Sequence, residues 1–441
     1  MTTHLSGRIV VAGLMALVAA VSGCARSSSD QRPPTSLAGM PGGPSTSRAS
    51  LDDTVSRMRA RLTKDAGDAT AAVTLADALI RQTRVSSNAG LANEAEGYLL
   101  AILQRYPDHY DARRMLAAVY LSEHRFREAL TEAGRCLTIR TDDAWVYGVV
   151  GDAHVELGEY AAAFEAFDRM AARRPNAASY ARASYARELQ GDLDGAVRFM
   201  RMATEATSAQ DPESLAWHHA QLGHLYLETG EIASARREYT HADYVFPGHP
   251  FATEGLARAE AADGRYDNAL TMVNRVIAVA PTPAALAFAG DLLSILGRAD
   301  EAERHYRLAE AAWQSDAPEP ARLARFLSER GRRLDDAVRL ARDVVADRRD
   351  IFTQDALAWA YFQSGDINRA RAAMTIAMST GSRDRVIRYH AAEIARASGQ
   401  MELARRYVDE ALDRSPLFDL MAAPAAAKLR DALAAPRVAR R

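Results

Sequence analysis

Five histidines lie within one short stretch of the chain and raise the question of a metal site. They are His218, His219, His224, His241 and His249. Imidazole is a common ligand of zinc and other transition metals. Thiolates contribute little here, because the chain has only two cysteines, Cys24 and Cys136. A multi-cysteine zinc site and a disulfide scaffold are therefore both excluded.

Motifs for catalysis and for nucleic-acid binding are missing from the sequence. It has no G-x-S-x-G, no Walker loop, no H-E-x-x-H and no C-x-x-C. The 55 Lys and Arg residues nearly balance the 57 Asp and Glu residues, whereas nucleic-acid-binding domains usually have a basic stripe. We expect no enzymatic activity, no cofactor and no nucleic-acid partner. An enzyme with an unrecognised site is the least favoured alternative.

The N-terminus is typical of an exported protein. Ile9–Val21 is an apolar run of 13 residues, which suits a signal peptide but is too short for a membrane-spanning helix. The run ends in Val21-Ser22-Gly23-Cys24, which resembles the bacterial lipobox. The resemblance implies that residues 1–23 are a lipoprotein signal peptide and that Cys24 is lipidated. The alternative is an ordinary secretory signal followed by a chance cysteine.

Residues 24–50 are rich in Ser, Pro and Gly and lack apolar periodicity, so we expect a flexible tether. The protein would then lie in the cell envelope, anchored by lipid to a membrane and facing the periplasm or the exterior. Residue 25 is Ala rather than Asp. The lipoprotein sorting pattern would therefore favour the outer membrane in a Gram-negative cell.

The remainder of the chain consists of about ten copies of one motif. Two sets of residues have identical internal spacings of 3, 4, 5, 4 and 8: Gly151, His154, Gly158, Ala163, Phe167, Pro175 and Gly223, Tyr226, Gly230, Ala235, Tyr239, Pro247. Repeats begin at residues 110, 144, 177, 216, 250, 283, 317, 351 and 385, mostly 33 or 34 residues apart. This pattern resembles the tetratricopeptide repeat (TPR), and a looser repeat precedes it from residue 69.

The resemblance implies an all-α fold, an α-α superhelix or TPR solenoid of about ten helix-turn-helix repeats over residues 69–418. Residues 51–68 read as an entry helix, and residues 419–441 as a C-terminal capping helix with a basic tail. Each repeat should contact only its neighbours. Two departures from the period, around residues 84–90 and 208–212, predict longer loops.

The repeat register places the histidines at different positions of the helix pairs and predicts the environment of Cys136. His219 falls inside a helix pair, His224 faces the groove, and His241 belongs to a second helix, so these side chains should not converge. We therefore expect no metal site. Cys136 occupies a small-residue position of a second helix and should be a core thiol.

A partner is expected in the concave groove. In TPR arrays, positions 2, 5, 9 and 12 of the first helix line this face, and the resemblance selects a set rich in aromatic and Arg residues: Trp145, Tyr185, Trp217, His224, Phe251, Arg258, Phe352, Trp359, Phe362, Tyr389 and Arg396. Aromatic and Arg side chains often dominate binding energy. The alternative is that the rings pack between neighbouring helices. The strongest candidate is the group of Phe352, Trp359 and Phe362.

The sequence thus predicts a lipid-anchored, non-enzymatic TPR scaffold of the bacterial cell envelope. It would bind a protein or peptide and support the assembly or positioning of an envelope complex. TPR lipoproteins of this kind resemble assembly factors of pili, secretion systems, the outer membrane and the cell wall. Capture of an acidic C-terminal tail by a carboxylate clamp is disfavoured, because position 9 of these repeats never holds Asn. The alternative function is an envelope solenoid that binds glycan or another small ligand.

Overall fold

The computed structural model describes residues 47–86, 88, 90–279, 281–315, 320–414 and 419–434. All of them belong to one compact unit. The expected signal peptide, the lipidated Cys24, the tether up to residue 46 and the basic tail from residue 435 lie outside the described residues.

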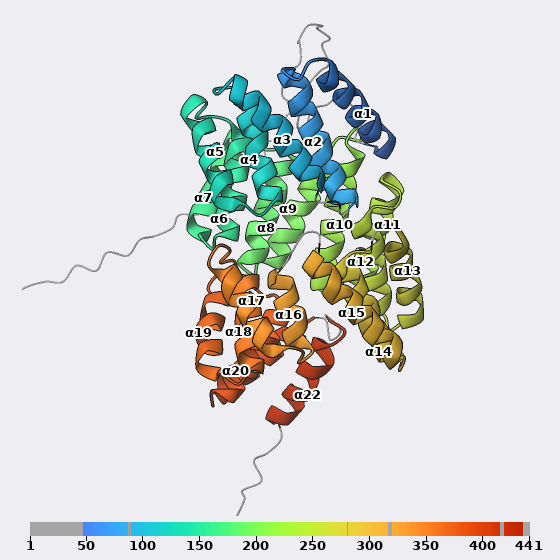
Figure 1. Ribbon diagram of the computed structural model, residues 1–441. Coiled ribbons are helices and arrows are strands. Elements are labelled where there is room, and N and C mark those ends of the chain that lie inside the picture. Colours follow the sequence, from blue (N-terminus) through green and yellow to red (C-terminus); the bar gives the residue numbers. More distant parts are fainter. Residues whose placement is uncertain are drawn as a thin grey trace, which may run out of the picture. The chain divides into compact units, whose positions relative to one another are not determined.

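The described chain is built from helices and has no strand. Ten helical hairpins follow one another between two single helices (Figure 1). The helices are α1 Arg48–Lys64, α2 Ala69–Ser86, α3 Gly90–Arg105, α4 Tyr110–Ser122, α5 Phe126–Ile139, α6 Ala144–Glu156, α7 Tyr160–Arg173, α8 Ala177–Leu189, α9 Leu193–Ala206, α10 Pro212–Glu228, α11 Ile232–Val245, α12 Pro250–Ala262, α13 Tyr266–Val279, α14 Pro283–Ile295, α15 Ala299–Ser315, α16 Pro320–Glu329, α17 Leu334–Val345, α18 Ile351–Gln363, α19 Ile367–Ala377, α20 Arg385–Ala397, α21 Met401–Leu412 and α22 Ala422–Ala434. Helices α2 to α21 form the hairpins.

Two positions of the repeat explain the hairpin geometry. An alanine early in each second helix lies against the first helix, and Ala129, Ala163 and Ala235 are among those with no exposed surface. A left-handed residue, such as Gly158 with φ of 73°, reverses the chain between the two helices. In the repeat that lacks this glycine, His124 adopts the same conformation with φ of 59°.

A single helix lies at each end of the array, and the first of them begins earlier than predicted. Helix α1 begins at Arg48, three residues before the predicted start at residue 51, because the Ser47 side chain caps the helix by accepting a hydrogen bond from Ser50 N–H. Leu51, Val55 and two further apolar residues of α1 are buried. At the other end, α22 has Pro424 in its first turn.

The expectation that each repeat contacts only its neighbours is wrong in two regions. The two departures from the repeat period meet: Arg81 and Arg84 at the end of α2 form ion pairs with Glu213, which is fully buried at the start of α10. In the second region, the loops before α18 and α20 contact α6 to α10. Side chains of opposite charge from distant repeats satisfy each other there, and no period of 34 residues encodes such pairs.

No described helix combines the length and the apolar character that a membrane span requires.

Candidate partner-binding groove

The predicted groove residues lie on the first helices of the hairpins, and Trp145 is the one nearest the start of the array. Trp145 is half-buried beneath the Arg114 guanidinium, which lies 4.1 Å from its ring centroid. Arg114 also forms an ion pair of 3.0 Å with Asp143, the N-cap of α6. The cation is therefore held over the indole by a carboxylate of the next repeat, and the pair forms a flat, partly exposed surface.

The C-terminal aromatic group is packed differently from what the sequence predicted. Trp359 and Tyr389 are only 4% and 8% exposed. The Trp359 ring stacks on His390 at 3.9 Å and on Phe362 at 4.8 Å, between α18 and α20. Trp359 and Tyr389 are therefore inter-repeat core, which corrects the expectation of an exposed aromatic row, and Phe362 is half-buried against the same core.

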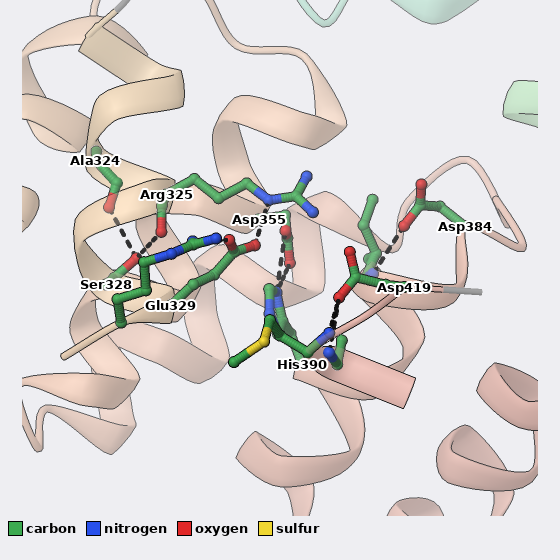
Figure 2. Close-up of polar contacts among 12 residues, drawn as sticks. Ala324, Arg325, Ser328, Glu329, Asp355, Asp384, His390 and Asp419 are labelled. Carbon is green, nitrogen blue, oxygen red and sulfur yellow. Dashed lines mark hydrogen bonds and ion pairs between the residues drawn. The ribbon is translucent and has the colours of Figure 1, made fainter. Parts of the chain in front are cut away.

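This packing follows from a buried polar pair that holds α18 against α20. His390 Nδ1 lies 2.9 Å from the carboxylate of Asp355, and both side chains have almost no exposed surface (Figure 2). The imidazole is thereby fixed in the plane that the Trp359 indole needs for stacking. On the neighbouring helix α16, Arg325 pairs with Glu329 at 2.6 Å. His390 is not among the predicted groove residues, because a histidine inside a helix gives no local sign of its partner.

In the middle of the array, side chains from four helices surround a small hollow. His224 lies on its wall together with Glu188, Glu228, Phe352 and Asp384. The full lining is Glu188, Leu189, Leu193, His224, Glu228, Phe352, Ser382, Arg383 and Asp384. Two predicted groove residues from distant repeats, His224 and Phe352, are therefore brought together.

The electrostatics of this hollow are dominated by its carboxylates. Burial raises the pKa of Glu228 to about 7, against the opposing charge of His224. Burial also raises the pKa of Asp384. Partial desolvation would lower the pKa of His224, whose side chain is still 49% exposed, but Glu188 and Glu228 raise it to about 9. The hollow thus holds protons near neutral pH and presents a protonated imidazole among carboxyl groups.

The remaining predicted groove residues differ in exposure. Phe251 is 43% exposed at the start of α12. Arg258 on the same helix is exposed, pairs with Glu254 at 2.7 Å and stacks on the Phe288 ring at 4.6 Å. Three more complete the predicted set: Tyr185 and Trp217 are half-buried, and Arg396 is exposed.

Sequence reasoning missed the residues that lie in loops or at helix ends. Glu228 closes α10, and Asp384 caps α20 by accepting a hydrogen bond from Ile387 N–H. Neither stands at position 2, 5, 9 or 12 of a first helix. Asp and Asn are common at helix N-termini for local reasons, so the sequence offered no signal that Asp384 also lines the groove.

The described residues give no support for a metal centre or a reactive thiol. They contain no group of three or more His, Cys, Asp or Glu side chains placed to hold a metal ion. The rings of His219 and His241 do stack, at 4.6 Å, contrary to the expectation that these side chains stay apart. Cys136 is fully buried as expected, and burial raises the pKa of its thiol to about 12, so the thiolate nucleophile is not formed at neutral pH.

A model of the tetratricopeptide repeat family matches residues 151–212, 221–275, 254–317 and 356–417, about half of the chain. The chain belongs to the tetratricopeptide repeat family. The hairpins α2 to α21 are its TPR units, and the all-α TPR solenoid predicted from the sequence is confirmed. The TPR fold is generally a non-enzymatic scaffold for protein interaction, and it indicates a protein partner for this chain.

Solved TPR-type structures are similar to this chain at low identity. One chain of the crystal structure of the APC/C hetero-tetramer Cut9–Hcn1 is 18% identical, with a TM-score of 0.38, over 83% of this chain and 64% of that chain. The human IFIT1 dimer with PPP-AAAA is 14% identical, with a TM-score of 0.49, over 76% and 79%. PilW, a type IV pilus biogenesis factor, is 18% identical, with a TM-score of 0.39, over 48% and 96%. This TPR chain thus spans less than two thirds of the first of these structures. A search of curated proteins gave no match.

Proposed function

We propose that this TPR protein is a lipid-anchored scaffold of the bacterial cell envelope, which binds a protein or peptide on its concave face and helps to assemble or position an envelope complex. The proposed location in the cell envelope is supported by the order of the N-terminal sequence. An apolar run is followed by Val21-Ser22-Gly23-Cys24 and by a Ser/Pro/Gly-rich tether that leads to the TPR array. Such an arrangement places an interaction module at a fixed membrane surface.

The accessible part of the groove suits a protein or peptide better than a glycan. The glycan alternative depended on a long row of exposed aromatic rings, and two of those rings, Trp359 and Tyr389, are buried. Among the predicted groove residues, Phe251 and Arg258 are both exposed and lie on the same helix, α12. Aromatic and Arg side chains are enriched among the residues that dominate binding energy in protein interfaces.

Site-specific photo-crosslinking in intact cells tests this proposal. A photoreactive phenylalanine analogue replaces Phe251 in one variant and Tyr244 in a matched control. Tyr244 is 80% exposed and lies only seven residues away, but it belongs to the second helix α11. We expect a defined protein adduct from position 251 that is absent at position 244 and absent when Arg258→Ala is added. Equal labelling from both positions would contradict a groove-bound partner.

A further inference from the structure

Backbone and side-chain groups join two segments of the array that lie about 190 residues apart. The Arg349 N–H donates a hydrogen bond of 2.9 Å to the carbonyl of Glu156 at the end of α6. Two residues later, the Ile351 N–H donates to the hydroxyl of Tyr160 at 2.8 Å. The guanidinium of Arg348 lies 2.7 Å from the Glu156 carboxylate. The loop before α18 is therefore fixed to the α6–α7 turn (Figure 1).

A second loop, together with Arg385 at the start of α20, makes similar contacts further along the array. The Arg385 guanidinium donates to the backbone carbonyl of Glu228 at the end of α10 and lies 3.6 Å from its carboxylate. The carbonyl of Gly381 lies directly against Gly191 in the α8–α9 turn. The loops before α18 and α20 thus contact three successive TPR units of the middle array.

Glycine at two of these turns serves a purpose beyond the reversal of the chain. A Cβ atom added at Gly158 would lie 2.7 Å from the carbonyl oxygen of Arg349, and one at Gly191 would lie 2.6 Å from that of Gly381. Gly264 has nearly the same φ, 75° against 73° at Gly158, yet an added Cβ there would meet nothing within 4 Å. The close approach of the distant loops therefore depends on Gly158 and Gly191, whereas Gly264 is needed only for its own turn.

The seam between these segments has an apolar centre and a polar rim. Val155 and Leu189 join Ile351 and Ile387 in one buried cluster. Around it lie partly exposed ion pairs such as Arg348–Glu156, whose side chains are 30% and 25% exposed. Partly exposed ion pairs of this kind contribute little stability, so the rim opposes opening only weakly. The hollow lined by His224 and Phe352 lies at this seam, with walls from both sides of it.

We propose that the loops 346–350 and 380–384 form an intramolecular latch, which holds α18–α21 against α6–α10 and covers the wall of this hollow at Leu189 until it opens. The latch would thereby control access to the groove, and this gating role rests on the proposed function, since it supposes that the groove receives a partner. The latch itself is a property of the chain and can be measured without any partner.

Hydrogen exchange in a matched pair of variants tests the latch. Gly158→Ala and Gly264→Ala introduce the same methyl group at nearly the same φ, so both strain their own turn, but only the first also displaces Arg349. We expect amides 349–351 to exchange about tenfold faster in Gly158→Ala than in Gly264→Ala, the change that loss of one net hydrogen bond predicts. Equal exchange of this segment in the two variants would overturn the latch.

Chemical labelling tests whether the latch covers the groove. Leu189 lines the hollow and is only 1% exposed. Leu189→Cys is made in a Cys24→Ser, Cys136→Ala background, and the rate of maleimide labelling is compared with and without Gly158→Ala, with Gly264→Ala as the control. We expect labelling to be about tenfold faster with Gly158→Ala, in proportion to the exchange of amides 349–351. Faster exchange with unchanged labelling would overturn the gating role. Because no partner is used, failure of the proposed function would leave both results unaffected.

Discussion

The hydroxyl of Tyr160 accepts a hydrogen bond of 2.8 Å from the backbone N–H of Ile351, a residue 191 positions further along the chain. Tyr160 begins α7 and Ile351 begins α18. A single side-chain oxygen therefore satisfies one of the backbone donors that a helix N-terminus leaves open. It links two TPR units that the repeat pattern alone would keep apart.

Replacement of this hydroxyl measures what the link contributes. We expect Tyr160→Phe to lower the free energy of unfolding by about 1 kcal/mol, because the Ile351 N–H loses its acceptor while the ring stays in place. Tyr244→Phe is the control, since that side chain is 80% exposed. Urea unfolding followed by circular dichroism compares the two. If both variants unfold at the urea concentration of the parent chain, the hydrogen bond contributes nothing to stability.

The packing of Trp359 predicts a loss of stability on truncation. Its ring is 4% exposed and stacks between His390 and Phe362, so we expect Trp359→Ala to cost about 3–5 kcal/mol. Trp359→Phe should cost less, because an aromatic ring remains. Phe251→Ala, at a site 43% exposed, should change stability by less than about 0.5 kcal/mol. A Trp359→Ala chain as stable as the parent in thermal unfolding would show that the ring is not part of the core.

The buried carboxylate of Glu213 predicts a large effect at Arg81. Its side chain has no exposed surface and lies 3.1 Å from Arg81 and 2.7 Å from Arg84. We expect Arg81→Met to cost about 3 kcal/mol, because it leaves buried negative charge poorly compensated. Arg57→Met removes an ion pair with Asp53 that is mostly exposed and should cost less than about 0.5 kcal/mol. Similar urea midpoints for these two variants would contradict this account of the α2–α10 contact.

The environment of His224 predicts an unusual titration. Its side chain is 49% exposed. Partial desolvation would lower its pKa, but the carboxylates of Glu188, 3.8 Å away, and Glu228 raise the pKa from 6.5 to about 9. Since the pKa is higher in the folded chain, protonated His224 stabilises the fold fully below pH 6.5, and this contribution is lost as the pH rises through 9. We expect an imidazole NMR signal that titrates near pH 9, is absent in His224→Gln, and moves towards 6.5 in Glu188→Gln. A midpoint near 6.5 in the parent chain would contradict this arrangement.

The lipid anchor predicts different outcomes for the two cysteines. We expect Cys24→Ser to move the protein from the membrane fraction to the soluble fraction and to abolish labelling with a fatty-acid analogue. Thermal unfolding should not change, because Cys24 precedes the repeat array. The control Cys136→Ala, at a buried core position, should stay lipidated and membrane-bound. Membrane retention of Cys24→Ser at high salt would indicate a different anchor.

The sequence by itself determined the repeat architecture of this protein. Helix pairs and their reversals depend on residues a few positions apart, such as Ala163 and Gly158, so a period of 33 or 34 residues predicts them directly. The same local reasoning predicted the buried thiol of Cys136 and the covering helices at both ends. It also marked the two departures from the period, around residues 84–90 and 208–212, without indicating that they meet.

Only the tertiary structure decided which predicted groove positions are open. Trp359 and Phe251 stand at two of the predicted concave positions, 9 and 2, yet one ring is sandwiched by His390 of the next repeat and the other remains exposed. The same is true of Gly158 and Gly264, which share a turn conformation and differ only in whether a distant loop lies against them. Contacts between residues some 190 positions apart depend on how all the intervening repeats stack. The pattern within a single repeat therefore contains no information about them.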